Sequence, residues 1–127
     1  MSDISRIAQA LMKLDDRLAD CMRCGLCQAV CPVFGATGKE SDVTRGKLAL
    51  LDNLAHKMIQ DADAVEEKIG RCLLCGSCQA NCPSGVSIME IFMAARQAWF
   101  RPLSSRASIF SRRDLSISYM RMTSGIN

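Results

Sequence analysis

All eight cysteines of this 127-residue chain lie in two short segments that share one pattern. The first cysteine motif, CMRCGLCQAVCP, covers residues 21–32, and the second cysteine motif, CLLCGSCQANCP, covers residues 72–83. A constant offset of 51 residues aligns the cysteines and four further pairs: Gly25 with Gly76, Gln28 with Gln79, Ala29 with Ala80, and Pro32 with Pro83. An internal repeat of this kind predicts two structurally similar units, here a pseudo-symmetric pair.

The spacing within each motif concentrates thiols in one place. Three cysteines separated by two residues each converge on a tight turn, and their thiolates repel one another unless a multivalent cationic centre binds them. Cys-x2-Cys-x2-Cys-x3-Cys-Pro is the ligand run associated with [4Fe–4S] clusters. We therefore predict two [4Fe–4S] clusters. Two four-thiolate zinc sites are an alternative, but zinc sites usually use separated Cys-x2-Cys pairs. Disulfides and a [3Fe–4S] or labile cluster fit the pattern less well.

In two-cluster proteins of this kind the fourth cysteine of each run ligates the other cluster. Crossed ligation of this type would join the two halves of the chain. The predicted ligands of cluster 1 are Cys21, Cys24, Cys27 and Cys82, and those of cluster 2 are Cys72, Cys75, Cys78 and Cys31. Gly25 and Gly76 would let backbone N–H groups approach the cluster sulfurs. The prolines would fix the backbone after the last ligand, and the side chains expected to exclude water are Met22, Leu26, Leu73 and Leu74.

The segments around the motifs have helical periodicity. Helices are predicted over residues 3–19, over 45–60 with Thr44 as a cap, from Asp63 to Gly70, and from Ser87 to about Arg101. Asp63 with Glu66, and Ser87 with Glu90, are read as capping boxes. Residues 33–43 are predicted to form a loop, and no segment is a clear strand. The expected fold is all-α, with a helical dicluster domain over 1–102 and a basic extension over 103–127 that contacts a partner.

Charge and hydropathy narrow the functional classes. Residues 96–127 contain six arginines and one acidic residue, Asp114, whereas residues 1–95 are slightly acidic. The basic stretch is interleaved with apolar residues, which favours a protein or membrane-surface contact over nucleic acid. No signal peptide or membrane span is visible. We expect a cytoplasmic protein, because reduced cytosolic thiols bind metal rather than form disulfides.

The chain resembles the α-helical ferredoxin domain of multi-subunit oxidoreductases, such as the heterodisulfide reductase C subunit. The segments 21–51 and 71–86 resemble the N-terminal part of the iron-sulfur subunits of glycolate oxidase and D-lactate dehydrogenase systems. The shared spacer features are Thr37-Gly38-Lys39-Glu40 and Thr44-Arg45-Gly46-Lys47. Larger members of that family continue into CCG-type cysteine segments, whereas no cysteine follows Cys82 here. The chain would therefore be either a complete small electron-transfer protein or a fragment.

The resemblance implies a non-catalytic electron-transfer subunit of an oxidoreductase complex. It would relay electrons between a flavoprotein-type dehydrogenase of a 2-hydroxy acid, such as glycolate or lactate, and a downstream acceptor or quinone. The expected partners are a flavoprotein, a cysteine-rich CCG-type subunit, or both, with peripheral contact to the inner face of the membrane through the complex. Alternatives are a role like that of the heterodisulfide reductase C subunit, a catalytic iron-sulfur enzyme, and a protein-interaction module braced by its clusters.

Outside the cysteines, no catalytic constellation stands out. The only histidine, His56, is predicted to be a solvated surface residue. The carboxylates of Asp15 and Asp16, which are adjacent to each other in the sequence, are expected to face solvent. Arg45 has two interpretations. It either simply begins a helix, or it lies near a cluster and tunes its potential or contacts a partner.

Overall fold

The computed structural model describes residues 4–100, and every regular element within that range is a helix, as the periodicity predicts. The elements are α1 (Ile4–Met12), α2 (Asp15–Ala19), α3 (Leu26–Val30), α4 (Pro32–Thr37), the 3₁₀ helix η1 (Glu40–Asp42), α5 (Thr44–Ala55), α6 (Ala62–Gly70), α7 (Ser77–Ala80) and α8 (Ile88–Trp99). No helix among the described residues is both long and apolar enough to cross a membrane. The predicted extension over 103–127 lies outside the described residues.

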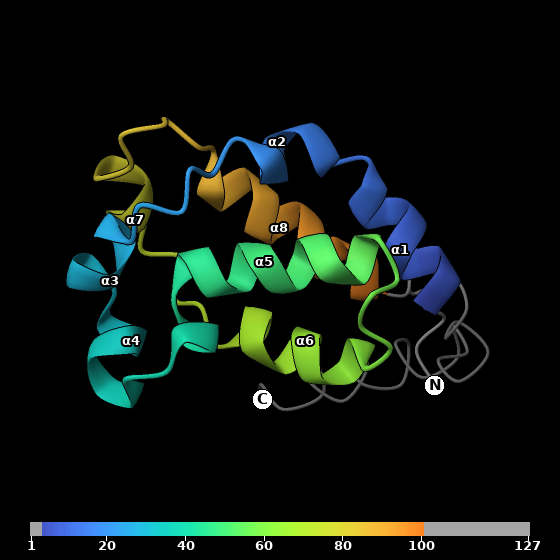
Figure 1. Ribbon diagram of the computed structural model, residues 1–127. Helices are drawn as coiled ribbons and strands as arrows, with labels where there is room; N and C mark the ends of the chain where they lie inside the picture. The colour runs from blue at the N-terminus through green and yellow to red at the C-terminus, as the bar shows by residue number, and fades with distance from the viewer. Residues whose placement is uncertain (1–3, 101–127) are drawn as a thin grey trace, which may run out of the picture.

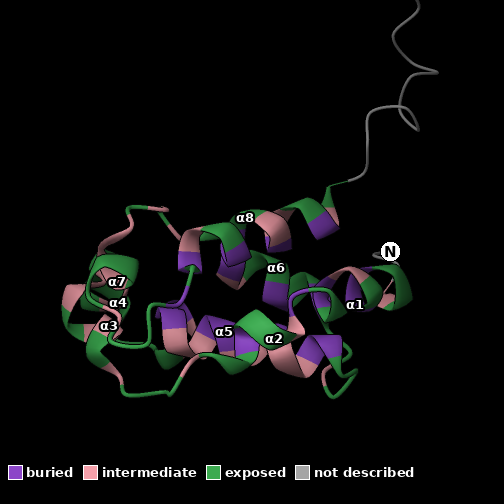
Figure 2. Cartoon of the chain, turned by 90° about the horizontal axis from the view of Figure 1, so that it is seen from above, coloured by how far each residue is buried: buried purple, intermediate pink, exposed green. Residues whose placement is uncertain are grey.

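The molecule has two ends with different packing. Helices α1, α2, α5, α6 and α8 form a bundle with α5 near its centre, whereas α3, α4 and α7 gather beyond the N-terminal end of α5 (Figure 1). Buried residues line the inner faces of the bundle helices, while α3, α4 and α7 contain only half-buried and exposed residues (Figure 2). The bundle is therefore the scaffold, and the cysteine motifs lie at its end.

The core follows from the apolar spacing of the bundle helices. Each fully buried Leu, Ile or Phe contributes about 1.5–3 kcal/mol relative to an exposed one. Side chains that are at most 1% exposed include Ile7, Leu11, Leu51, Leu54, Ile69, Ile91 and Phe92. They come from α1, α5, α6 and α8, so residues before, between and after the two cysteine motifs form one core.

Two predicted helices are shorter than expected. The helix predicted over 3–19 breaks into α1 and α2, although Leu14 and Leu18 still reach the core. The helix predicted over 45–60 ends at Ala55, because Lys57 adopts a left-handed backbone with φ 57°. This turn carries Met58 away from the core, and its side chain is 76% exposed.

The loop predicted over 33–43 is wrong, because this segment contains α4 and η1. Pro32 at the first turn of α4 has the φ that a helix start requires and lacks only an N–H that would be unpaired there. The Cys31 sulfur accepts a hydrogen bond from the Phe34 N–H at 3.5 Å and caps the helix. The proline therefore begins a helix.

The predicted caps are also corrected. Asp61, not Asp63, caps α6 by accepting a hydrogen bond from the Ala64 N–H at 3.0 Å. Ser87 precedes α8 but makes no capping side-chain hydrogen bond. The Met89 N–H instead donates to Oε1 of Gln79, at 2.9 Å, from the second cysteine motif. The predicted capping residue Thr44 is the first residue of α5, where Val43 occupies the cap position without a side-chain hydrogen bond.

The spacer between the motifs packs closely against α5. The Lys47 side chain is only 1% exposed, and its Nζ donates to the main-chain carbonyl of Asp42 at 2.7 Å. The Asp42 side chain is fully buried and lies 3.7 Å from cationic nitrogens of both Lys68 and Arg71. A Cβ at Gly46 would collide with the carbonyl oxygen of Glu40. Together these contacts hold η1 against α5 and α6.

Candidate iron-sulfur centres

The two cysteine motifs share an unusual backbone path. Arg23 and Leu74, at equivalent positions, both have left-handed φ angles, 56° and 53°. Gly25 and Gly76 follow with φ 83° and 76°, and each is directly followed by a short helix, α3 or α7. Left-handed non-glycine residues are strained and concentrate at functional sites. The sequence repeat therefore extends to the backbone conformation of the two turns.

Two cavities lie at these turns, and each is lined by cysteines from both motifs. The first cavity, about 350 Å³ including its solvent-open part, is lined by Cys21, Cys24, Cys27 and Cys82. The second cavity, about 390 Å³ on the same basis, is lined by Cys31, Cys72, Cys75 and Cys78. Cys78, Thr44 and Ile88 line both cavities, so the two share a wall.

The donor set of each cavity fits a [4Fe–4S] cluster, which cysteine thiolates hold. No carboxylate or imidazole lines either cavity, and the remaining walls are mostly apolar. All eight cysteines are free thiols rather than disulfides. The second cavity is lined by three cysteines of the second motif and Cys31 of the first, and the first cavity by three cysteines of the first motif and by Cys78 and Cys82 of the second. The cavity linings are consistent with the predicted crossed ligation, which stays a prediction because Cys78 lines both cavities.

Burial and local hydrogen bonds shift the pKa values of the thiols in different directions. Burial raises the pKa of Cys27, while a hydrogen bond from the Arg45 main-chain N–H partly opposes it. Burial likewise raises the pKa of Cys78, opposed chiefly by a hydrogen bond from the Thr44 side chain. The pKa of the exposed Cys75 is lowered, first by a hydrogen bond from the Ser77 main chain and then by one from its hydroxyl. Helix N-termini and hydroxyls therefore point toward the sulfurs.

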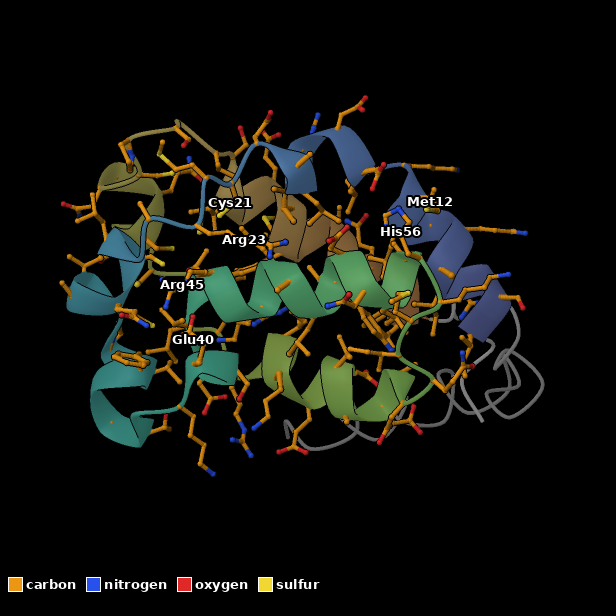
Figure 3. All side chains as sticks on the ribbon, viewed as in Figure 1. Met12, Cys21, Arg23, Glu40, Arg45 and His56 are labelled. Atoms are coloured by element: carbon orange, nitrogen blue, oxygen red, sulfur yellow. The ribbon has the colours of Figure 1, made fainter. Side chains whose placement is uncertain are left out.

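Arg45 lies at the first cavity, as one of its two interpretations anticipated. Its guanidinium lines that cavity beside Cys24 and Cys27. Its Nε donates to Glu40 Oε1 at 2.6 Å, and its Nη1 donates to the Arg23 main-chain carbonyl at 3.3 Å. Figure 3 shows Arg45, Glu40 and Arg23 together at the N-terminal end of α5. A Cβ at Gly25 would lie 2.7 Å from Arg45 Nη1, so the glycine makes room for the guanidinium.

Two cationic side chains that contact the surroundings of the second cysteine motif are not evident from the sequence. Arg96 belongs by sequence to the basic stretch, but it lies on α8, and its Nη2 donates to the carbonyls of Ile69, Gly70 and Cys72 at 3.0, 3.2 and 2.5 Å. Lys47 is buried and lines the second cavity. Because both contacts join segments distant in sequence, periodicity could not reveal them. The one local signal was the position of Lys47, one turn after Val43 and on the same side as Leu51.

The residues predicted to exclude water differ in whether they line a cavity and in how exposed they are. Leu26 lines the first cavity, and Leu73 and Leu74 line the second. Met22 lines neither cavity. Met22 and Leu73 are equivalent in the repeat, and both are 67% exposed. The cysteines Cys24 and Cys75, also equivalent, are exposed as well. Each cavity is therefore apolar on its inner side and open at its outer edge.

His56 is half-exposed, as predicted, but it is not isolated. Its Nδ1 lies 2.9 Å from the Asp52 main-chain carbonyl and 3.2 Å from Asp52 Oδ1, and its Nε2 lies 3.7 Å from Asp15 Oδ1. The hydrogen bond to the Asp52 carbonyl is the main reason why the pKa of His56 is raised, with smaller contributions from the two carboxylates. Asp15 therefore faces His56 as well as solvent.

Comparison with known proteins identifies relatives with iron-sulfur names. Over 83 residues the chain is 37% identical to the "Probable glycolate oxidase iron-sulfur subunit" of Bacillus subtilis, covering 65% of this chain and 19% of the relative. It is 33% identical over 103 residues to the "Glycolate oxidase iron-sulfur subunit" of Escherichia coli, covering 75% of this chain and 24% of the relative. The chain thus spans about a quarter or less of these relatives.

A third relative, a heterodisulfide reductase C-like protein of Archaeoglobus profundus, is 30% identical over 93 residues, which cover 72% of this chain and 46% of the relative. No solved structure matches the chain. Residues 17–86, which contain both cysteine motifs, match the 4Fe-4S dicluster domain family. The chain therefore belongs to the 4Fe-4S dicluster domain family, and its eight cysteines fit two [4Fe–4S] clusters.

Proposed function

We propose that this chain relays electrons within an oxidoreductase complex through two [4Fe–4S] clusters with crossed ligation. Cluster 1 is held by Cys21, Cys24, Cys27 and Cys82, and cluster 2 by Cys72, Cys75, Cys78 and Cys31. The observation that supports this most directly is the pair of cysteine-lined cavities with a shared wall. Two one-electron centres whose cavities share a wall suit a relay, whereas a purely structural role would need only one.

The bound clusters supply the one-electron chemistry, and the protein supplies position and environment. The cysteine thiolates hold the clusters, and the left-handed turns at Gly25 and Gly76 bring main-chain N–H groups toward them. Ile88, Phe92 and Val86 keep water from the inner walls of the cavities. Neither cavity is lined by a histidine or carboxylate that could act as a general base. This supports electron transfer rather than substrate chemistry in this chain.

The relatives suggest where the electrons come from. Two of them are named as glycolate oxidase iron-sulfur subunits, which supports a flavoprotein-type dehydrogenase of a 2-hydroxy acid as the donor. The acceptor would be a cysteine-rich CCG-type subunit or, further downstream, a quinone. In this proposal the dicluster domain covers residues 1–102, the basic extension over 103–127 contacts a partner, and any association with the cytoplasmic face of a membrane occurs through that partner.

A heterodisulfide reductase C-like role is the second candidate. One relative carries that name, and the chain covers 46% of it, against 19% and 24% of the two glycolate oxidase subunits. The same two clusters would then serve a different donor and acceptor. The partner subunits, and not the cluster sites, distinguish the two candidates.

The test begins with anaerobic purification and analysis of metal content. We expect about eight iron atoms and eight acid-labile sulfides per chain, the content of two [4Fe–4S] clusters, together with EPR signals on reduction by dithionite. A colourless protein that contains zinc and no sulfide would refute the proposal. Capture of partners from a native extract with the tagged full chain then decides between the candidates. A flavoprotein supports the 2-hydroxy-acid role, and another heterodisulfide reductase protein supports the second.

A further inference from the structure

The N-terminal end of α5 lies between the two cavities. Thr44, its first residue, is only 5% exposed and lines both of them. No side chain caps this helix, so the N–H groups of its first turn are available to other acceptors, and the helix dipole places partial positive charge there. The Arg45 N–H is directed at the Cys27 sulfur. This helix end therefore faces the sulfur ligands of both centres.

The side chains of Thr44 and Arg45 lie beside different cysteines. Successive helix residues are about 100° apart around the axis, so two neighbouring side chains point in different directions. Thr44 lines the second cavity together with Cys78, a member of the cluster 2 set, and a hydrogen bond from its hydroxyl opposes the burial that raises the pKa of Cys78. The Arg45 guanidinium lines the first cavity, beside Cys24 and Cys27 of the cluster 1 set. One helix turn thus gives a hydroxyl donor to one centre and a positive charge to the other.

The Thr44 hydroxyl and the Arg45 guanidinium both favour the reduced state of the cluster that lies beside them. Reduction adds one negative charge to a cluster, and hydrogen bonds to sulfur or nearby cations stabilise that charge and raise the reduction potential. The effect of Arg45 is partly offset by Glu40, whose Oε1 lies 2.6 Å from the Arg45 Nε. The hydroxyl of Thr44 has no such opposing charge, because neither cavity is lined by a carboxylate.

We propose that the first two residues of α5 set the two reduction potentials independently: Thr44 raises that of cluster 2, and Arg45, moderated by Glu40, raises that of cluster 1. This inference rests on the proposed ligand assignment. Its consequence is that the difference between the potentials, and so the downhill direction of the relay, is adjustable at two adjacent positions. Both are positioning and tuning residues rather than ligands.

The experiment is an EPR-monitored redox titration of the full chain carrying both clusters. Cys24→Ser and Cys75→Ser, at exposed ligands of different cavities, assign the two signals to their clusters. Thr44→Val removes only the hydroxyl and should lower the potential of cluster 2. We expect the ratio of reduced to oxidised cluster 2 at a fixed potential to fall threefold to tenfold; tenfold corresponds to about 59 mV for one electron. Thr44→Ser keeps the hydroxyl and should restore the wild-type value.

The second pair of variants gives shifts of opposite sign at cluster 1. Arg45→Gln should lower its potential, and Glu40→Gln, at a residue whose side chain is 48% exposed, should raise it. Neither should move cluster 2. If Thr44→Val destabilises the fold, Thr44→Ala, which also lacks the hydroxyl, replaces it as the test for cluster 2, and Arg45→Gln and Glu40→Gln still test cluster 1. Unchanged potentials, or equal shifts of both clusters, with iron and sulfide content intact, would overturn the inference. Absence of iron and sulfide from the wild-type chain would instead refute the proposed function.

Discussion

The two cysteine motifs have the same backbone but different surroundings. Gly25 and Gly76 have nearly the same φ, yet the Arg45 guanidinium covers Gly25, whereas no residue other than its chain neighbours lies within 4 Å of the position that a Cβ at Gly76 would occupy. The repeat therefore preserves what the ligands require, namely the left-handed turns and thiol spacing. The contacts outside the repeat differ, which makes the two centres chemically distinct.

The side chains that form hydrogen bonds with the two turns come from different helices. In the first motif, Arg45 of α5 holds the Arg23 carbonyl, and the Gln28 amide donates to Glu40. In the second, Arg96 of α8 holds the Cys72 carbonyl, and Gln79 accepts from the N-terminus of α8. Equivalent glutamines thus tie one motif to the spacer and the other to α8. We expect each turn to be damaged separately by changes on its own supporting helix.

The largest expected effect comes from breaking the proposed crossed ligation. Cys31→Ser should abolish or strongly alter cluster 2, although Cys31 lies in the first motif, because its thiol lines the cavity of Cys72, Cys75 and Cys78. Cys82→Ser should do the same to cluster 1. EPR after dithionite reduction, with iron analysis, measures the loss. Loss of the cluster held by the neighbouring cysteines of the same motif would show that ligation is not crossed.

Removing the support of the second turn should have the next largest effect. Arg96→Met deletes the guanidinium that donates to three main-chain carbonyls and leaves those acceptors with fewer partners. Hydrogen bonds from a charged group contribute about 1.5–3 kcal/mol, so we expect a loss of about 2 kcal/mol, measured by anaerobic denaturant unfolding. The cluster 2 signal should broaden or diminish more than that of cluster 1.

Arg17→Met is the matched control for Arg96. Arg17 forms an exposed ion pair with Glu90 of α8, 3.0 Å between Nη1 and Oε2, and such surface pairs contribute about 0–1 kcal/mol. It should leave both cluster signals unchanged. Equal loss of stability in the two variants would mean that Arg96 has no special role at the second turn.

A smaller effect, on the cluster potentials, should distinguish the alanine variants of Gly25 and Gly76. Alanine at Gly25 or Gly76 must adopt a left-handed conformation, at a cost of roughly 1–2 kcal/mol, so both variants should lose similar stability. Only Gly25→Ala also displaces the Arg45 guanidinium. We therefore expect redox titration to show a changed cluster 1 potential in Gly25→Ala and an unchanged cluster 2 potential in Gly76→Ala. Identical behaviour of both centres would argue that the surroundings of the turns are equivalent.

Much of this architecture could be predicted from sequence, because the decisive signals are local. Cysteine spacing indicated the cofactor, and apolar periodicity located the bundle helices. Errors arose where a single backbone angle decides the outcome, as at Lys57, whose left-handed turn ends α5 and exposes Met58. The helical start at Pro32 was missed because a proline after a cysteine motif reads equally well as the end of an element or the beginning of one.

Long-range contacts account for what remained unpredicted at the site. The sequence does not show that Arg96 reaches the Cys72 carbonyl, or that Lys47 is buried beside Cys78. Charged residues are rarely buried unless they are paired, so a sequence reading places both at the surface. Only packing of α5 and α8 against the second motif brings Lys47 to the cavity and Arg96 to the Cys72 carbonyl. These residues make the surroundings of the two similar motifs different.

The smallest expected effect lies away from both turns, at the C-terminal end of α5. The pKa of His56 is raised in the folded state, mainly by its hydrogen bond to the Asp52 carbonyl. A raised folded pKa stabilises the protein fully below the unfolded value of about 6.5, and this contribution is lost as pH rises through the folded pKa. Wild type should therefore exceed His56→Gln in Tm at pH values near 6, and the difference should shrink at higher pH. Both cluster spectra should stay unchanged, because His56 lines neither cavity; a pH-independent difference in Tm would contradict the ionic origin of this stabilisation.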